Sequence, residues 1–321
     1  MKLIEHCSHV GGDWTSNKEG IQICSLCDQP AVGVYRDITN TTYQSLGCLS
    51  NSLLGVIAKS PAHLKYKVMS GEEPSEIGSV LHIGSAFHTL VLQPDRWDED
   101  VAVLPDATEQ GGKATWYRTI EGKEFKAAFL EENKSKAMIK HDQVSLLDMM
   151  AKSVYEDDLA GQYLEADALN ELSIVFDYFG IRFRSRIDKL ISGSADYPDV
   201  IVDLKTVRSG SMDDFARSVY CHGYYRAAHA YRESVEQLVG DRPVDVIFIA
   251  VEKEPPFCVG VYRLGQISIN SGGRMNEKLI NDYLECCRLD SWPGYTPEIR
   301  DLDLQEYQLN QAAEIYMEDK G

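Results

Sequence analysis

The 321-residue sequence lacks several features that define special classes of protein. It contains no run of eighteen apolar residues, and its first residues have no long apolar core, so we expect neither a membrane span nor a secretory signal. It has no internal repeat. Basic residues are also fewer than acidic ones: 32 Lys and Arg against 50 Asp and Glu give a net charge of −18 at pH 7. That balance argues against a simple nucleic-acid coat, but an enzyme needs a basic lining only along its cleft.

The eight cysteines do not form the pattern of a disulfide framework, which indicates a reducing, cytoplasmic protein. Cys7-x-His9 and Cys24-x-x-Cys27 together supply four ligands with the spacing of a small zinc knuckle or ribbon. Four protein ligands leave no open position, so the predicted Zn²⁺ is structural. His6 could replace His9, and the alternative is two unrelated thiol pairs in a flexible leader.

The chain divides by composition into three parts. Residues 1–37 form the predicted zinc-binding segment, residues 38–307 one large domain, and residues 308–321 an acidic tail. Within the large domain, periodicity predicts helices over 53–58, 75–93, 143–169 (two helices), 212–239 and 272–288, and strands over 171–179, 182–190, 200–204, 244–251 and 258–264. Residues 105–140 are expected to be solvated loop and helix. This order predicts an α/β (α+β) fold, a central mixed sheet flanked by helices.

The strand over 200–204 contains an aspartate, Asp203, and a lysine, Lys205, follows it directly. Asp203 and Lys205 share one side of the strand, while Val202 and Leu204 face the other side and pack. If this strand pairs with the hairpin strand before it, Asp203 and Asp188 meet at one end of the sheet. Two close carboxylates require a cation, and hard oxygen ligands with a phosphate substrate suit Mg²⁺ or Mn²⁺. Lys205 would then activate water or stabilise charge on the phosphate; the alternative is a surface ion pair.

Further candidate residues lie on both sides of this strand. His88 is on an apolar helical stretch, where it could instead be a core residue, and Glu171 opens the first hairpin strand. Arg184 and Arg186 share a face with Asp188 and are candidate substrate contacts. After the strand comes an aromatic and basic stretch, 223–231. There Arg226 could contact a phosphate, and Tyr224 and Tyr231 are either substrate contacts or packing residues.

Six motifs occur in a fixed order over about 250 residues. They are the segment 52–66 with Ser60-Pro-Ala-His63, Gly84-x-x-x-His88, Glu171-Leu-Ser, Arg186-Ile-Asp188, Asp203-Leu-Lys205-Thr and Trp292-Pro-Gly-Tyr295. This set resembles the PD-(D/E)XK nuclease superfamily, and specifically the exodeoxyribonuclease VIII (RecE-type) nuclease domain that is common in phages.

The resemblance implies a site and an activity. It implies that His88, Asp188, Asp203 and the Leu204 carbonyl bind Mg²⁺, that Lys205 is catalytic, and that Glu171 lies beside them. It also implies degradation of linear double-stranded DNA from 5′ ends, leaving 3′ single strands for recombination. A ring-shaped homo-oligomer, a single-strand annealing partner and a phage or prophage origin within a bacterial cytoplasm follow from the same resemblance. We expect the channel of such a ring to be lined by Arg182, Arg184, Arg208 and Arg217.

One position departs from the family pattern. The family places a glutamine four residues before the tyrosine that corresponds to Tyr231, and here that residue is Ala227; Arg226 or His229 could substitute for it. Two alternatives therefore stay open. One is a Cas4- or RecB-like nuclease of the same superfamily, which the adjacent Cys286 and Cys287 disfavour because no set of four cysteines flanks the core. The other is a non-catalytic DNA- or protein-binding module.

Overall fold

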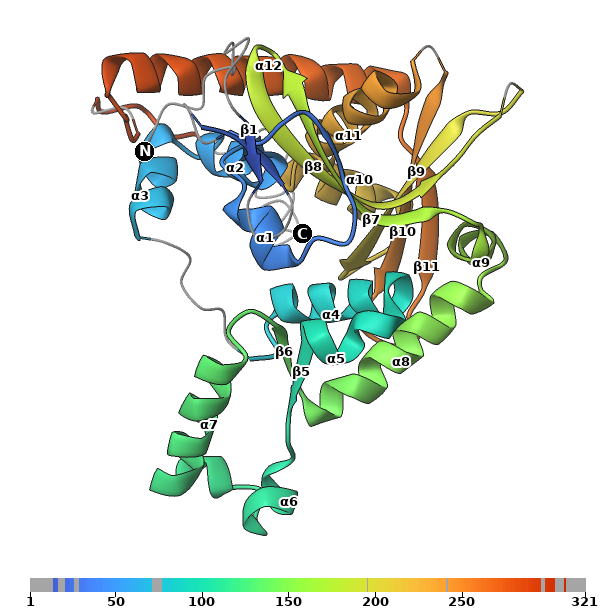
Figure 1. Cartoon of the computed structure of the whole chain (residues 1–321). Helices are drawn as coiled ribbons and strands as arrows, with labels where there is room; N and C mark the ends of the chain where they lie inside the picture. The colour runs from blue at the N-terminus through green and yellow to red at the C-terminus, as the bar shows by residue number, and fades with distance from the viewer. Residues whose placement is uncertain are drawn as a thin grey trace, which may run out of the picture.

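The computed structural model describes residues 14–16, 21–25, 29–70, 77–194, 196–240, 242–295, 298–303 and 309. A twisted seven-stranded sheet lies at its centre, with helices on both faces (Figure 1). The strands are β3 (Gly33–Tyr35), β4 (Leu49–Ser50), β7 (Leu169–Tyr178), β8 (Ile181–Ile191), β9 (Asp199–Val207), β10 (Val244–Glu252) and β11 (Val259–Arg263). Their order is β11-β10-β9-β8-β7-β3, and β4 pairs with β8. The mixed α/β fold expected from the sequence is confirmed.

The strands form by the alternation that the sequence displays. The predicted hairpin is β7–β8, antiparallel, with its turn at Phe179 and Gly180, both at positive φ. β9 runs antiparallel to β8 but parallel to β10, which helices α10 and α11 make possible by returning the chain to the far end of the sheet. β9 is four residues longer than expected because Asp199 at one end and residues 205–207 at the other also pair with β10.

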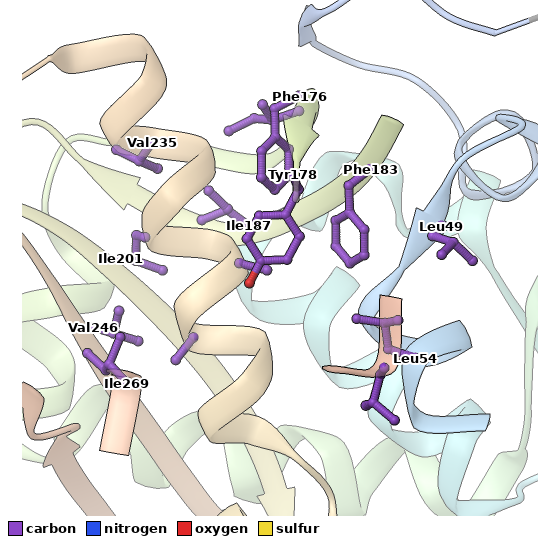
Figure 2. Close-up of a cluster of buried hydrophobic side chains, with 14 of the residues drawn as sticks. Leu49, Leu54, Phe176, Tyr178, Phe183, Ile187, Ile201, Val235, Val246 and Ile269 are labelled. Carbon is purple, nitrogen blue, oxygen red and sulfur yellow. The ribbon is translucent and has the colours of Figure 1, made fainter. Parts of the chain in front are cut away.

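Each face of the sheet is covered by its own set of helices. One face packs against α2 (Asn51–Ile57), α10 (Met212–Cys221), α11 (Tyr224–Val239) and α12 (Gln266–Leu289). Figure 2 shows this cluster, in which Leu54, Val235 and Ile269 meet side chains of the strands. The other face packs against α4 (Val80–Leu92), α8 (His141–Glu156) and α9 (Asp158–Glu165). Each fully buried side chain of this kind contributes roughly 1.5–3 kcal/mol through loss of apolar surface to water.

The alternation of β9 connects the two clusters. Ile201 belongs to the first cluster, whereas Val202 and Leu204 belong to the second and are completely covered by it. This is the packing that the sequence predicted for Val202 and Leu204. It holds β9 rigidly between two helical layers, so the polar residues interleaved with these apolar ones are positioned by the core.

The predicted long helix over 212–239 is wrong in one respect. It is broken into α10 and α11 at His222 and Gly223, where Gly223 has a φ of 71°. That left-handed conformation is open to glycine but disfavoured for other residues, so the glycine ends one helix and begins the next. Helices α2 and α3 are also separate: α2 ends at Ile57, and Pro61 begins α3 (Pro61–Ser70).

Residues 105–136 form an arm that lies apart from the main sheet (Figure 1). It leaves the body after β5 (Val101–Leu104) and returns at β6 (Ala137–Lys140), and these two strands form a small parallel sheet that the sequence did not predict. The arm carries α6 (Ala107–Gly111), a 3-10 turn (Trp116–Arg118) and α7 (Ile120–Glu132). Another 3-10 turn (Pro94–Arg96) and α5 (Trp97–Asp100) link α4 to β5. The arm has a small hydrophobic core of its own, which includes Phe125 and Phe129 beside Met138.

The N-terminal segment is described only in part. β1 (Trp14–Ser16) and β2 (Gln22–Cys24) pair antiparallel, β3 then forms an edge strand of the main sheet, and α1 (Asn40–Ser45) follows it. Cys24 is buried, but Cys7, His9 and Cys27 lie outside the described residues, so the zinc site stays a prediction. The domain boundaries at 37 and 308 also stay predictions, since the tail is described only at Leu309. Among the helices described, none has the length and apolarity needed to cross a bilayer.

Candidate active site

The site lies where β8 and β9 separate. The two strands pair from Ile191↔Val200 to Lys189↔Val202 and then diverge, and farther along β8 pairs with β4 instead. Asp188 and Asp203 are the next residues on either side of this fork. The backbone N–H of Leu204, which β8 no longer engages, donates to Asp188 Oδ2 at 2.8 Å. The sequence prediction that the two aspartates meet at one end of the paired strands therefore agrees with the geometry.

His88 reaches this fork from α4. Gly84 lies one turn earlier, and a Cβ placed there would be 3.6 Å from Thr206 Oγ1. The helix thus lies close against β9. His88 Nε2 is 2.7 Å from the Leu204 carbonyl oxygen, and Nδ1 is 3.6 Å from Asp188 Oδ2. His88, Glu171 and Asp188 each offer a ligand atom, and these three atoms lie within 4.8 Å of one another.

Glu171 has an unusual backbone at this point. The register on both sides of it, Asn170↔Lys189 and Leu172↔Ile187, places it opposite Asp188. Its φ is 49°, a left-handed conformation that costs a non-glycine residue about 1–3 kcal/mol. Its Oε1 lies 3.8 Å from His88 Nδ1. The strained residue thus directs its carboxylate toward the same point as Asp188.

Asp203 and Lys205 form the second half of the site. The two side chains are in direct ion-pair contact, and Asp203 is 1% exposed. Burial raises the pKa of Asp203, and the nearby Asp188 raises it further. Burial acts to lower the pKa of Lys205, but Asp203 and Asp188 outweigh it, so the lysine pKa is raised and the amine stays protonated. Among the described residues, Asp203 Oδ1 has no hydrogen-bond partner although it is fully buried.

The donors present at the fork fit a divalent cation. Burial acts to lower the pKa of His88, but the carboxylates of Asp188 and Glu171 raise it to about 9. Without a metal, the protonated imidazole is therefore the positive charge that these carboxylates face. Carboxylate oxygens with one imidazole suit Mg²⁺ or Mn²⁺, and the unpartnered Asp203 oxygen is a further available donor. The Leu204 oxygen faces His88 Nε2, so its predicted role as a metal ligand stays a prediction.

Arg184 does not occupy the position that the sequence predicted. It is 3% exposed, and its Nη1 donates to the backbone carbonyls of Tyr43, Gln44 and Leu46. It therefore fixes the end of α1 and is not available to a substrate. Arg182 is likewise buried, at 4% exposure beside Asp177, so neither arginine can line a channel. Strand alternation placed both on the sheet, but it did not reveal which segment would cover them.

Arg186 is closer to the predicted role. Its Nε donates to Ser173 Oγ at 2.9 Å, and its guanidinium lies 4.3 Å from the ring centre of Tyr43. Nε is 4.0 Å from Glu171 Oε2. Arg186 is thus a positive charge beside Glu171 that is fixed in place by Ser173 and Tyr43. Tyr43, which the sequence analysis missed, is buried against it, and its short helix carried no motif that could have identified it.

Helix α11 contributes the aromatic wall. Lys205 Nζ is 5.2 Å from the centre of the Tyr224 ring. Burial raises the pKa of Tyr231 well above its usual range, and the negative charges of Asp203 and Asp188 add to the effect. Arg226, by contrast, is 8% exposed and packed within the protein.

His229, the other residue predicted as a possible substitute for the missing glutamine, is also engaged elsewhere. His229 Nδ1 is 2.8 Å from the hydroxyl of Tyr178, at the opposite end of β7 from Glu171. It cannot take the place of a glutamine at Ala227. Ala227 itself is half-buried.

The first and last sequence motifs come together on one side of the molecule. Ser60 Oγ is 2.6 Å from His63 Nδ1, and Ala62 N donates to the Pro293 carbonyl at 3.1 Å. The rings of His63 and Tyr295 are 5.9 Å apart. Two motifs separated by about 230 residues therefore form one structural unit.

Comparison with known proteins agrees with this architecture. A crystal structure of a putative exonuclease from Eubacterium rectale aligns with 86% of this chain and 98% of its own, at 13% identity and a TM-score of 0.53. The crystal structure of the protein SSO0001 aligns with 61% of this chain and 84% of its own, at 13% identity and a TM-score of 0.26, too low for comparison of the folds. No curated protein sequence matches the chain. The profile of the PDDEXK-like domain of unknown function DUF3799 matches residues 50–303, a range that holds every residue of the fork, and the chain therefore belongs to this PDDEXK-like family.

Proposed function

We propose that this protein is a divalent-metal-dependent nuclease that hydrolyses phosphodiester bonds of DNA. The observation that carries the proposal is the convergence of His88, Glu171 and Asp188 within 4.8 Å, beside the buried pair Asp203–Lys205. A buried carboxylate cluster of this kind is costly unless a cation binds it. When bound there, a Mg²⁺ or Mn²⁺ ion would supply an activated water and polarise the phosphate.

The chain's own residues have distinct roles in this proposal. His88, Asp188 and Asp203 bind the metal, and Glu171 lies beside it, oriented by Arg186. Lys205, held protonated by Asp203, stabilises negative charge on the phosphate and does not remove a proton from water. Tyr224 and Tyr231 bound the site on the α11 side.

The finer activity rests on resemblance. The RecE-type motifs support an exonuclease that degrades linear double-stranded DNA from 5′ ends, and the similar fold of the Eubacterium rectale protein, described as a putative exonuclease, is compatible with it. We extend the proposal to a ring-shaped oligomer that acts with a single-strand annealing protein in a phage or prophage setting. Of the basic residues predicted to line the ring, only Arg208 and Arg217 are exposed.

The test is digestion of DNA of different topology. Linear and closed circular duplexes are incubated with Mg²⁺, Mn²⁺ or EDTA, and 5′- and 3′-labelled substrates report polarity. We expect loss of linear DNA only, no loss in EDTA, and at least a ~100-fold slower reaction for Lys205→Ala. Lys278→Ala, which removes an exposed lysine of α12, is the matched control. Intact linear DNA with wild-type protein in both metals would refute the nuclease proposal.

A further inference from the structure

Two pairs of aromatic rings lie at the junction of α10 and α11. The rings of His222 and Tyr224 are stacked, 5.4 Å apart and 19° from parallel. Those of Tyr220 and Tyr225 are 6.0 Å apart and 14° from parallel. The break at Gly223 brings rings from two successive helices together. We call these four side chains the aromatic patch.

The patch extends from the candidate active site to solvent. Tyr224 is the ring beneath the Lys205 amine, at 5.2 Å. His222 is exposed and held by a 3.0 Å contact between Nδ1 and the Ser218 carbonyl, and Tyr220 is 74% exposed. What sets these rings apart from single exposed aromatic residues is their stacked arrangement beside the site, which offers flat faces to other flat groups.

Cations accompany the patch. Arg217 is one helical turn before Tyr220 on α10, and its side chain is 78% exposed. Arg208 is exposed just beyond the end of β9, three residues after Lys205. The first turn of α10 also carries Asp213 and Asp214, and Asp214 lies 3.7 Å from Arg217. Arg217 therefore lies between the exposed ring of Tyr220 and the carboxylate of Asp214, about one helical turn from each, and its side chain stays largely open to solvent.

We propose that the aromatic patch binds the unpaired bases of single-stranded DNA adjoining the active site, with Arg217 and Arg208 contacting its phosphates. The inference rests on the proposed function. A ring stacks on any base, but only a base that is not paired and stacked within a duplex exposes its face, which is why single-stranded sites combine aromatic rings with cations. In an exonuclease, this strand is the part of the substrate that has separated from its complement at the end being degraded.

The test measures binding without cleavage. A short single strand containing 2-aminopurine is titrated with protein in EDTA at low salt, and anisotropy and 2-aminopurine quenching are followed. We expect quenching by the wild type and affinity about tenfold lower for the double variant Tyr220→Ala, His222→Ala. Tyr220→Phe should bind as the wild type does because it keeps the ring. Tyr197→Ala is the control, since Tyr197 is 72% exposed before β9, at the opposite end of that strand from Lys205.

The outcomes separate this inference from the proposed function. Equal affinity and equal quenching for the wild type and the double variant would overturn the inference, as would absence of binding by the wild type. Cleavage of duplex ends by the wild type, together with unchanged binding by the double variant, would refute only the patch. Ring-dependent binding without cleavage in any metal would refute only the nuclease.

Discussion

His88 Nε2 lies 2.7 Å from the carbonyl oxygen of Leu204, which follows it by 116 residues in the chain. This contact joins α4 to β9 at the fork, and it sets the orientation in which Nδ1 faces Asp188 and Glu171. A histidine that binds a metal commonly donates its other N–H to a backbone carbonyl in this way. The arrangement therefore fits an imidazole that releases its Nδ1 proton when a metal binds.

Metal binding should raise thermal stability through Asp188. An ion at 100 times its dissociation constant adds about 2.7 kcal/mol, which for a chain of this size corresponds to a Tm increase of roughly 5 °C. Asp188→Asn should abolish the Mn²⁺-induced increase, yet keep an oxygen that can accept from Leu204 N–H. Differential scanning fluorimetry with and without Mn²⁺ measures this change in Tm, and Asp282→Asn on α12 serves as the control. An undiminished shift in Asp188→Asn would place the ion elsewhere.

Gly84 should tolerate one methyl group and nothing larger. A Cβ there meets Thr206 Oγ1 at 3.6 Å, an ordinary contact, so Gly84→Ala should gain up to ~1 kcal/mol of stability from helix propensity. Gly84→Leu should push α4 away from β9 and displace His88. We expect it to fold with reduced stability and to lose the Mn²⁺-induced Tm shift. Urea denaturation and the Mn²⁺ titration, run on both variants, separate these effects; a Leu variant with a normal shift would contradict the close packing.

Arg184 should matter for stability and not for substrate binding. Arg184→Met leaves the buried carbonyls at the end of α1 without their donor, at a cost of about 2–4 kcal/mol in the free energy of unfolding. The same change at Arg217, which is exposed, should alter that free energy by no more than ~0.5 kcal/mol. Guanidinium denaturation measures both. Full stability of Arg184→Met would show that these hydrogen bonds are dispensable.

His229 should make the protein sensitive to acid. Burial lowers its pKa to about 4, and Arg232 acts in the same direction. Asn276 donates to the Tyr178 oxygen, so the Tyr178 hydroxyl donates to a neutral Nδ1. A lowered folded-state pKa means that this contribution to stability is complete above about 6.5 and is lost as pH falls toward 4.

The corresponding measurement compares wild type with His229→Gln. Between pH 7 and pH 4.5 the urea midpoint of the wild type should fall farther, because glutamine takes up no proton. The comparison is necessary because Asp203 acts in the opposite sense: its raised pKa relieves a buried charge as pH falls. Parallel pH profiles for the two proteins would refute the role of His229.

The sequence predicted the sheet and the fork well, for a physical reason. Alternation over β7 and β8 and the apolar run of β9 are local signals, and strand geometry alone then relates Asp188 to Asp203. The burial of Arg184 depends on α1, which is about 140 residues away, and the positive φ of Glu171 occurs at a local interruption of the β7–β8 pairing, opposite Asp188. Neither feature can be predicted from the residues that are adjacent in the sequence. The break at Gly223 was readable in principle, since a glycine within a helical pattern is a warning of a helix end.

The arm has a consequence for handling this protein. Its two ends are joined by the short parallel pair β5–β6, in which Val101 and Ile139 also pack into the cluster on one face of the main sheet. The small hydrophobic core of residues 105–136 includes side chains of β5 and β6 and Ile77, and it does not include residues of the active-site fork. A reporter domain or affinity label inserted into the exposed turn after Gly112 should therefore leave the active-site residues of the main sheet undisturbed. The protein could also be immobilised on a surface through this arm.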